Sequence, residues 1–156
     1  GLVGGISGPW LALFPAVVFI VGAFLAFATG TSWGTFGILI PIVVSTFSGT
    51  NHTMMIISIS ACMAGAVCGD HCSPISDTTI MASAGAQCSH INHVSTQLPY
   101  VLVVAVVSCI TYIIAGFVQS PVLPLIIGIV LMVGTLFGIK YLMKNIAVRD
   151  KKHKVQ

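Results

Sequence analysis

Two carboxylates in this chain are isolated from every other charge. Asp70 and Asp77 lie in the short polar segment CGDHCSPISDTT, and no other formally charged side chain occurs before Lys140. The surrounding sequence is apolar enough for a membrane interior, where a central charge costs about 2.5 to 3.5 kcal/mol on insertion scales. Each carboxylate therefore needs a proton, a bound cation or a basic residue from another segment. The first two options are the chemistry of ion translocation.

Hydroxyl groups surround the two carboxylates and offer further oxygen ligands. Such oxygens suit a hard cation such as sodium, above all where a broken helix also exposes carbonyl groups. We predict that Asp70 and Asp77 are the metal ligands of a transported sodium ion. The other candidates for ion or proton binding lie in the same segment and in a second polar stretch, TGTSWGT at residues 29–35: His71, Ser73, Ser76, Thr78, Thr79, Thr31, Ser32 and Thr35.

The two carboxylates have different expected surroundings. Asp70 follows Gly69 at the end of an apolar segment, where the helix macrodipole is negative and favours a proton or a cation. Asp77 precedes two threonines, so it also has a purely structural interpretation as the N-cap of a restarting helix. His71 is expected to be a hydrogen-bond or proton partner of Asp70.

The composition is that of an integral membrane protein. Of the 156 residues, 56% are hydrophobic and 6% are charged, and the mean hydropathy is +1.06. An ordinary soluble domain has about 25% charged residues. The basic residues behind the net charge of +3 all lie at or after Lys140, which is typical of a cytoplasmic membrane flank and not of nucleic-acid binding. Nothing in the pattern requires a cofactor besides the transported ions.

The apolar runs predict an all-α polytopic membrane protein. Residues 10–28 carry no charge and are long enough to cross a bilayer as a helix. The next apolar run, 36–47, is too short to cross alone. Together with the polar residues 29–35 it predicts either a second broken helix or a re-entrant hairpin.

The second half of the chain predicts one broken helix and two uninterrupted spans. Proline lacks an amide proton and clashes with the preceding turn, so Pro74 predicts a break near Ser73 in a discontinuous helix over residues 54–87. Residues 100–118 and 122–143 predict the two spans, joined by a tight Gln-Ser-Pro turn. Small-residue pairs at helical spacing permit close contacts between helices: Gly65 with Gly69, and Gly134 with Gly138.

The charge distribution predicts an orientation. Residues 1–143 are expected to form a membrane domain surrounded by lipid, and residues 144–156 a basic tail. Because positive charge collects on the cytoplasmic side, the C-terminus is expected in the cytoplasm and the protein in the cell membrane. The chain opens without an initiator Met, which predicts a piece of a longer protein whose N-terminal half supplies part of the site. A homo-oligomer is also compatible with this sequence.

Two other kinds of site have to be weighed. A zinc site is one, because Cys68 and Cys72 are spaced as zinc ligands, but the remaining ligands would be Cys88, His90 and His93 across a helix break. The two histidines are better interpreted as loop residues, and the cysteines as small buried apolar residues, since their odd number predicts no disulfide framework.

An intramembrane aspartyl protease is the alternative from another class, because two carboxylates that share a proton can hydrolyse a peptide. Such enzymes carry a G-x-G-D motif. Here Asp70 follows Val67-Cys68-Gly69, so the first glycine is absent, and both aspartates belong to one segment. The sequence therefore favours a transporter over an enzyme.

The stretch GDHCSPISDTTIMASAGAQCSHINHVSTQLPY, residues 69–100, closely resembles the signature region of the NhaC-type Na+/H+ antiporter family within the broader ion transporter superfamily. TGTSWGTFGILIPI before it fits the same resemblance, which extends over about residues 22–118. Members have several hundred residues and about a dozen membrane segments, so the resemblance implies the C-terminal portion of such a protein.

The resemblance implies sodium efflux driven by proton entry, with alternating access to a shared site. Some similar proteins exchange organic acids such as malate and lactate together with these ions, which keeps an ion-coupled organic acid antiporter as the alternative. The superfamily also has hairpins and broken helices from inverted repeats. This agrees with the interpretation of residues 10–47 and 54–87.

Overall fold

The computed structural model describes residues 9–49, 51–120 and 122–153. Within these residues the chain forms seven helices and no strand, which confirms the all-α prediction. Four helical segments are apolar and long enough to cross a membrane, whereas the helix over residues 32–47 is shorter. In chain order the helices are α1 (Pro9–Ala12), α2 (Phe14–Thr29), α3 (Ser32–Phe47), α4 (His52–Cys72), α5 (Asp77–Gly85), α6 (His90–Val118) and α7 (Val122–His153).

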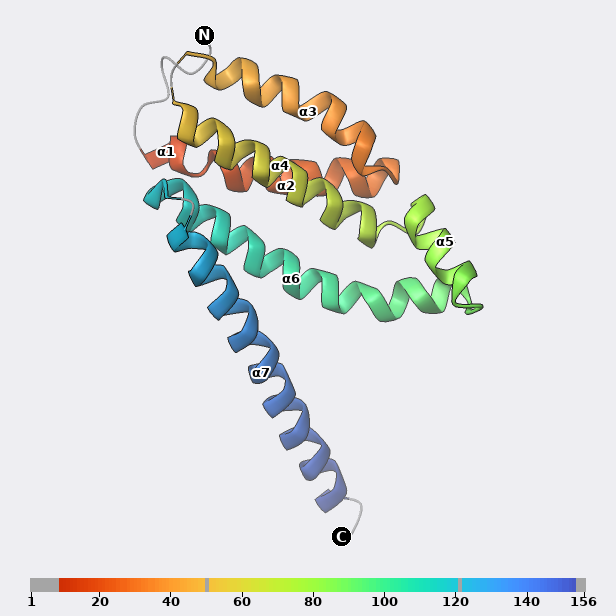
Figure 1. Cartoon of the computed structure of the whole chain (residues 1–156). Helices are drawn as coiled ribbons and strands as arrows, with labels where there is room; N and C mark the ends of the chain where they lie inside the picture. Colours follow the sequence, from red (N-terminus) through yellow and green to blue (C-terminus); the bar gives the residue numbers. More distant parts are fainter. Residues whose placement is uncertain (1–8, 50, 121, 154–156) are drawn as a thin grey trace.

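Helix α4 is the centre of the bundle, with α2, α3 and α6 packed around it (Figure 1). Its closest neighbour is α2, and glycine makes this approach possible. A Cβ atom at Gly65 would collide with the backbone carbonyl of Phe19, and one at Gly69 would collide with that of Ala23. The small-residue pair predicted from the sequence therefore forms the seam between the two helices.

The apolar core lies at the other end of these helices, away from the polar segments. Its buried members come from α2, α3 and α4, and the rings of Phe14 and Phe47 meet edge to face with their centroids 5.0 Å apart. Asn51 caps the start of α4, because its side chain accepts a hydrogen bond from the Met54 amide at 3.1 Å. The buried side chains of this core are Val18, Val43, Phe47, Met54 and Cys62.

The first interruption is a hairpin between two helices. α2 ends at Thr29, Gly30 adopts a left-handed conformation with φ of 69°, and α3 begins at Ser32. α3 then folds back along α2 and α4 (Figure 1). The structure shows a hairpin and not a broken helix, and Trp10–Thr29 before the turn is long enough to cross a membrane. That the hairpin is re-entrant stays a prediction. The polar stretch is also shorter than predicted, because Ser32 and Thr35 lie inside α3.

The second interruption lies where the proline predicted it. α4 ends at Cys72, residues 73–76 are not helical, and the chain becomes helical again as α5 at Asp77. α4 alone has 21 residues and enough apolar length to span a membrane, so the break follows a complete helix. α5 is a separate helix of 9 residues beside the start of α6 (Figure 1).

Helix α6 begins ten residues earlier than predicted, at His90 rather than Tyr100. The prediction of a polar loop ending at Pro99 was wrong, and so was the placement of His90 and His93 in a loop. Pro99 removes a single backbone hydrogen bond from the helix interior. Upstream hydroxyls form additional bonds to the same helix, such as Ser95 to the Ile91 carbonyl at 2.8 Å.

Helix α7 leaves the bundle and packs only against α6 among the described elements (Figure 1). It confirms the predicted last span and continues through His153 into the basic stretch. Pro121, in the predicted turn before it, lies outside the described residues, as do residues 154–156. Almost every apolar side chain on α7 up to Tyr141 is exposed or half-buried.

Candidate functional site

Asp70 is buried at the end of α4, with 3% of its surface exposed. It lies one residue after Gly69, whose close approach to Ala23 draws this end of α4 against α2. The hydrogen-bond partner of its carboxylate among the described residues is the hydroxyl of Ser76, which donates to Oδ1 at 2.6 Å. A buried carboxylate whose partner is a hydroxyl rather than a basic side chain has an incompletely satisfied charge.

Three side chains at the break form a short hydrogen-bonded chain: Asp70 at the end of α4, Ser76 in the break and Thr78 at the start of α5. The Ser76 hydroxyl has one proton, which it gives to Asp70. The Thr78 hydroxyl lies 2.7 Å from Ser76 Oγ and therefore donates to it. Both hydroxyl oxygens keep lone pairs, so this chain offers oxygen ligands beside a carboxylate.

The backbone of the break turns around Ser73, which is completely buried. Its amide donates to the carbonyl of Asp70 at 3.1 Å, and its hydroxyl accepts from the Ile75 amide at 3.4 Å. Because the last carbonyls of a helix have no donor within the helix, this turn satisfies only part of them. The break thus concentrates carbonyl, hydroxyl and carboxylate oxygens within a few residues.

Asp77 has a different environment from Asp70, because it is exposed and is the first residue of α5. Its carboxylate accepts a hydrogen bond from the Thr78 amide at 2.8 Å. The N-cap position itself belongs to Ser76, so Asp77 satisfies an amide of the first turn instead of capping from outside. Thr79, two residues after Asp77, is buried with 3% of its surface exposed.

The two interruptions meet at one end of the bundle (Figure 1). A Cβ atom at Gly30 would lie 2.9 Å from the carbonyl oxygen of Ile75, so the α2–α3 turn rests directly on the break after α4. Thr35 is buried beside this turn and donates to the Thr31 carbonyl at 3.0 Å, and Ser32 is also buried. The structure therefore brings the two predicted groups of hydroxyls to the same end, although no hydrogen bond joins them among the described residues.

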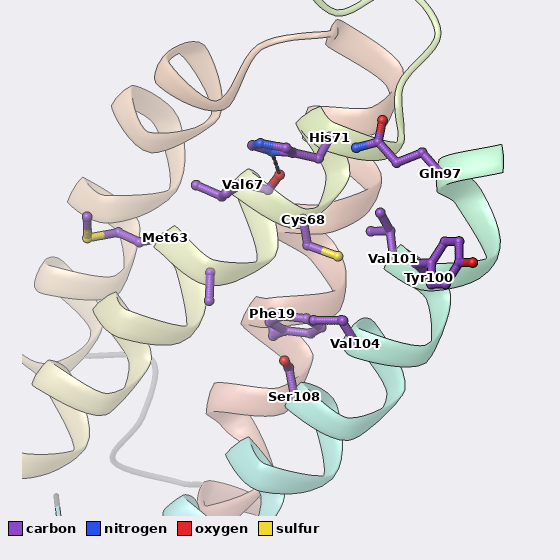
Figure 2. Close-up of a pocket in the computed structure, with 11 residues that line it drawn as sticks. Phe19, Met63, Val67, Cys68, His71, Gln97, Tyr100, Val101, Val104 and Ser108 are labelled. Atoms are coloured by element: carbon purple, nitrogen blue, oxygen red, sulfur yellow. Dashed lines mark hydrogen bonds between the residues drawn. The ribbon is translucent and has the colours of Figure 1, made fainter. Parts of the chain in front are cut away.

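The side chain of His71 lies on another face of α4 and forms no hydrogen bond with Asp70. Its Nδ1 pairs with the Val67 carbonyl at 2.9 Å, and its ring lines a cavity of about 560 Å³ between α4 and α6 (Figure 2). The cavity is mostly apolar, with Gln97 near His71 at one end and Phe19 deeper in. The predicted hydrogen bond between His71 and Asp70 is thus not formed.

His90 is a site residue that sequence reasoning missed. As the first residue of α6 it reaches back to the break, where Nε2 lies 2.6 Å from the Pro74 carbonyl oxygen. Its Nδ1 lies 3.1 Å from the hydroxyl of Ser83 in α5. Spacing alone gave no signal for this contact, because it depends on α6 starting before its apolar run.

The residues weighed as zinc ligands do not converge. Cys68 and Cys72 lie one turn apart on α4. Among the described residues, however, no three His, Cys, Asp or Glu side chains lie close enough together to hold a metal ion. The His90 ring nitrogens already contact Pro74 and Ser83.

Comparison with known proteins finds relatives that are named as antiporters. The chain is 47% identical over 130 residues, 83% of its length, to an uncharacterized protein of Haemophilus influenzae, and 27% identical over 76% of its length to a malate-2H+/Na+-lactate antiporter of Bacillus subtilis. It is 34% identical over 69% of its length to an arginine/ornithine antiporter of Halobacterium salinarum.

These matches cover 25%, 29% and 23% of the respective relatives, so the chain spans about a quarter of their length. No solved structure matches it. The family model of the Na+/H+ antiporter family matches residues 6–117, which include both interruptions and the buried aspartate. The chain belongs to the Na+/H+ antiporter family.

Proposed function

We propose that this chain supplies an ion-binding part of a secondary transporter that exchanges sodium ions for protons by alternating access. The observation that carries the proposal is Asp70, a buried carboxylate held by a hydroxyl at the broken end of a membrane helix. A carboxylate in such a place is stabilised by a proton or by a cation. Family membership supports antiport rather than an enzymatic reaction.

Competition for one carboxylate explains how the exchange is coupled. When Asp70 binds a proton, its charge is neutral, and Ser76, which itself accepts from Thr78, donates to its Oδ1. When sodium binds, the carboxylate is ionised and the same hydroxyl oxygens turn their lone pairs to the ion. One occupant excludes the other, so each transport cycle moves one in place of the other.

The remaining predicted ligands act around this centre. Ser73 is buried in the turn of the break, and Thr79 is buried in the first turn of α5. Thr31, Ser32 and Thr35 approach from the α2–α3 turn, which rests on the break through Gly30. Asp77 is exposed and is assigned to the entry of the site rather than to its centre.

The test uses everted membrane vesicles that contain the full-length protein, in which sodium is added after a proton gradient has been imposed. Asp70→Asn keeps the shape and removes the charge, and it should weaken sodium binding by about 3 kcal/mol, or about 100-fold in apparent affinity. Asp77→Asn is the matched variant in the same segment and should have the smaller effect. Sodium-driven dissipation of the gradient that survives unchanged in Asp70→Asn contradicts the proposal.

An organic substrate is the second candidate, because two relatives are named as antiporters of malate with lactate and of arginine with ornithine. The same vesicles decide between them. Sodium-driven proton movement that needs no added organic solute supports Na+/H+ exchange. Movement that occurs only with malate, lactate or a basic amino acid supports the alternative.

The location in the cell membrane and the cytoplasmic C-terminus are part of the same proposal. They are supported by the apolar helices and by the position of the basic residues from Lys140 onward. A C-terminal tag should be cleaved by protease in everted vesicles and protected in intact cells. The reverse pattern contradicts this orientation.

A further inference from the structure

A single imidazole connects three parts of the polar end of the bundle. His90 belongs to the first turn of α6, its Nε2 meets the Pro74 carbonyl in the break, and its Nδ1 meets the Ser83 hydroxyl in α5. Ser83 is buried, with 3% of its surface exposed. No other side chain among the described residues forms hydrogen bonds with both the break and α5.

The number of available protons determines whether each ring nitrogen of His90 donates or accepts a hydrogen bond. A carbonyl oxygen only accepts, so His90 must carry a proton on Nε2 to hold Pro74 at 2.6 Å. In the neutral ring, Nδ1 then accepts from the Ser83 hydroxyl. In the charged ring, Nδ1 donates to Ser83, whose own proton goes to the Ile80 carbonyl at 2.9 Å. The bond to Pro74 therefore exists in both protonation states.

This bond bears on the ion site because of where Pro74 lies. It stands between Ser73, whose amide binds the Asp70 carbonyl, and Ser76, whose hydroxyl binds the Asp70 carboxylate. Fixing the Pro74 carbonyl fixes the path of the chain between these two contacts. Among the described residues, no other hydrogen bond joins the break directly to α6.

We propose that His90 is a positioning residue of the ion site, which holds the break through its Nε2 proton and does not carry the transported proton. The inference rests on the proposed function of Asp70. It assigns a role to a histidine that lies outside the polar segment of the two aspartates and touches neither of them. The part of His90 that matters is a donor at Nε2, not its ability to change charge.

Substitution by glutamine or asparagine separates the hydrogen-bond donor at Nε2 from the ability to change charge, because neither amide side chain titrates. The amide nitrogen of glutamine lies four bonds from Cα, as Nε2 does, so His90→Gln keeps a donor for Pro74. The asparagine nitrogen lies three bonds away, as Nδ1 does, so His90→Asn keeps only the contact with Ser83. His93→Asn is the matched control on the next turn of α6, since the ring of His93 forms no hydrogen bond to the described residues.

The first measurement is the sodium concentration for half-maximal exchange in vesicles, taken over a range of pH. We expect His90→Asn to raise it about fivefold, because the Pro74 carbonyl is exposed and the loss is the net value of one hydrogen bond, about 1 kcal/mol. His90→Gln should restore it to within about twofold of the wild type and leave the pH profile unchanged. A pH profile that shifts or flattens in His90→Gln contradicts the proposal, as does an equal loss in both variants.

The second measurement does not depend on transport. In the purified protein, hydrogen exchange at the amides of Ile75 and Ser76, which are bonded inside the break, should be faster in His90→Asn than in the wild type, in His90→Gln or in His93→Asn. This result can hold even if no sodium is exchanged, which would overturn the proposed function alone. Equal protection of these two amides in all four proteins overturns the role of His90.

Discussion

Helices α4 and α7 each carry two glycines four residues apart, and the structure uses them in opposite ways. Gly65 and Gly69 press against the backbone of α2, whereas a Cβ atom at Gly134 or Gly138 would meet nothing within 4 Å. In the apolar window of α4, 39% of the residues are buried, against 6% in that of α7. The spacing permits a close contact between helices, but a neighbour has to be present for the contact to form.

The most direct test of this difference between α4 and α7 is to add one methyl group to a glycine in each helix. Gly65→Ala places a Cβ atom against the Phe19 carbonyl and should destabilise the protein by about 3 kcal/mol. Gly134→Ala meets open space and should leave stability unchanged or slightly raised, because alanine favours a helix. Unfolding in detergent, followed by circular dichroism, measures both. Equal effects would mean that the seam between α2 and α4 is not tight.

A second pair of glycines tests whether the difference between packed and open positions also holds outside the helices. Gly30 and Gly49 both have positive φ, at 69° and 81°, but only Gly30 lies against another segment. Gly49→Ala should cost about 1 kcal/mol for the left-handed backbone alone. Gly30→Ala adds the collision with Ile75 and should cost about 1 to 3 kcal/mol more, with a loss of sodium affinity in the vesicle assay. A Gly30→Ala protein that matches Gly49→Ala in both measurements would count against the contact.

The smallest expected effect has the opposite sign. Ser58 in α4 is completely buried, and its hydroxyl has no hydrogen-bond partner among the described residues. Ser58→Ala should therefore stabilise the protein by up to about 1 kcal/mol, because it removes an unsatisfied polar group. The hydroxyl of Thr135 in α7 is exposed and donates to the Leu131 carbonyl at 2.7 Å, so Thr135→Ala should change stability by less than about 0.5 kcal/mol. A loss of stability in Ser58→Ala would reveal a partner for that hydroxyl.

The sequence predicted those features that depend on one local cause. Pro74 ends α4 within a residue of the predicted place, and the apolar spans Trp10–Thr29 and Val122–Tyr141 lie within two residues of the predicted ones, although α7 itself continues to His153. The prediction failed where a local sequence signal did not decide the structure of the folded chain. Pro99 and the polar residues before it predicted a loop, yet α6 continues through them from His90.

The candidate site was predictable in its residue types but not in its geometry. Asp70 and the hydroxyls of Ser76 and Thr78 belonged to the predicted set, and the structure joins them by hydrogen bonds. The direction in which each side chain of α4 points was not predictable, because apolar or small residues occur on every side of this helix. For that reason His71 was expected at Asp70, although it lines the cavity on the α6 side.

The contact between Gly30 and Ile75 has a mechanical consequence. At this point the turn of the α2–α3 hairpin lies against the carbonyl group and the side chain of Ile75, and Gly30 has no side chain of its own to separate the two backbones. A side chain would absorb a small displacement by changing its rotamer, whereas backbone against backbone passes the displacement on. We therefore expect a movement of the α2–α3 hairpin to displace the break, and a movement of the break to displace the hairpin.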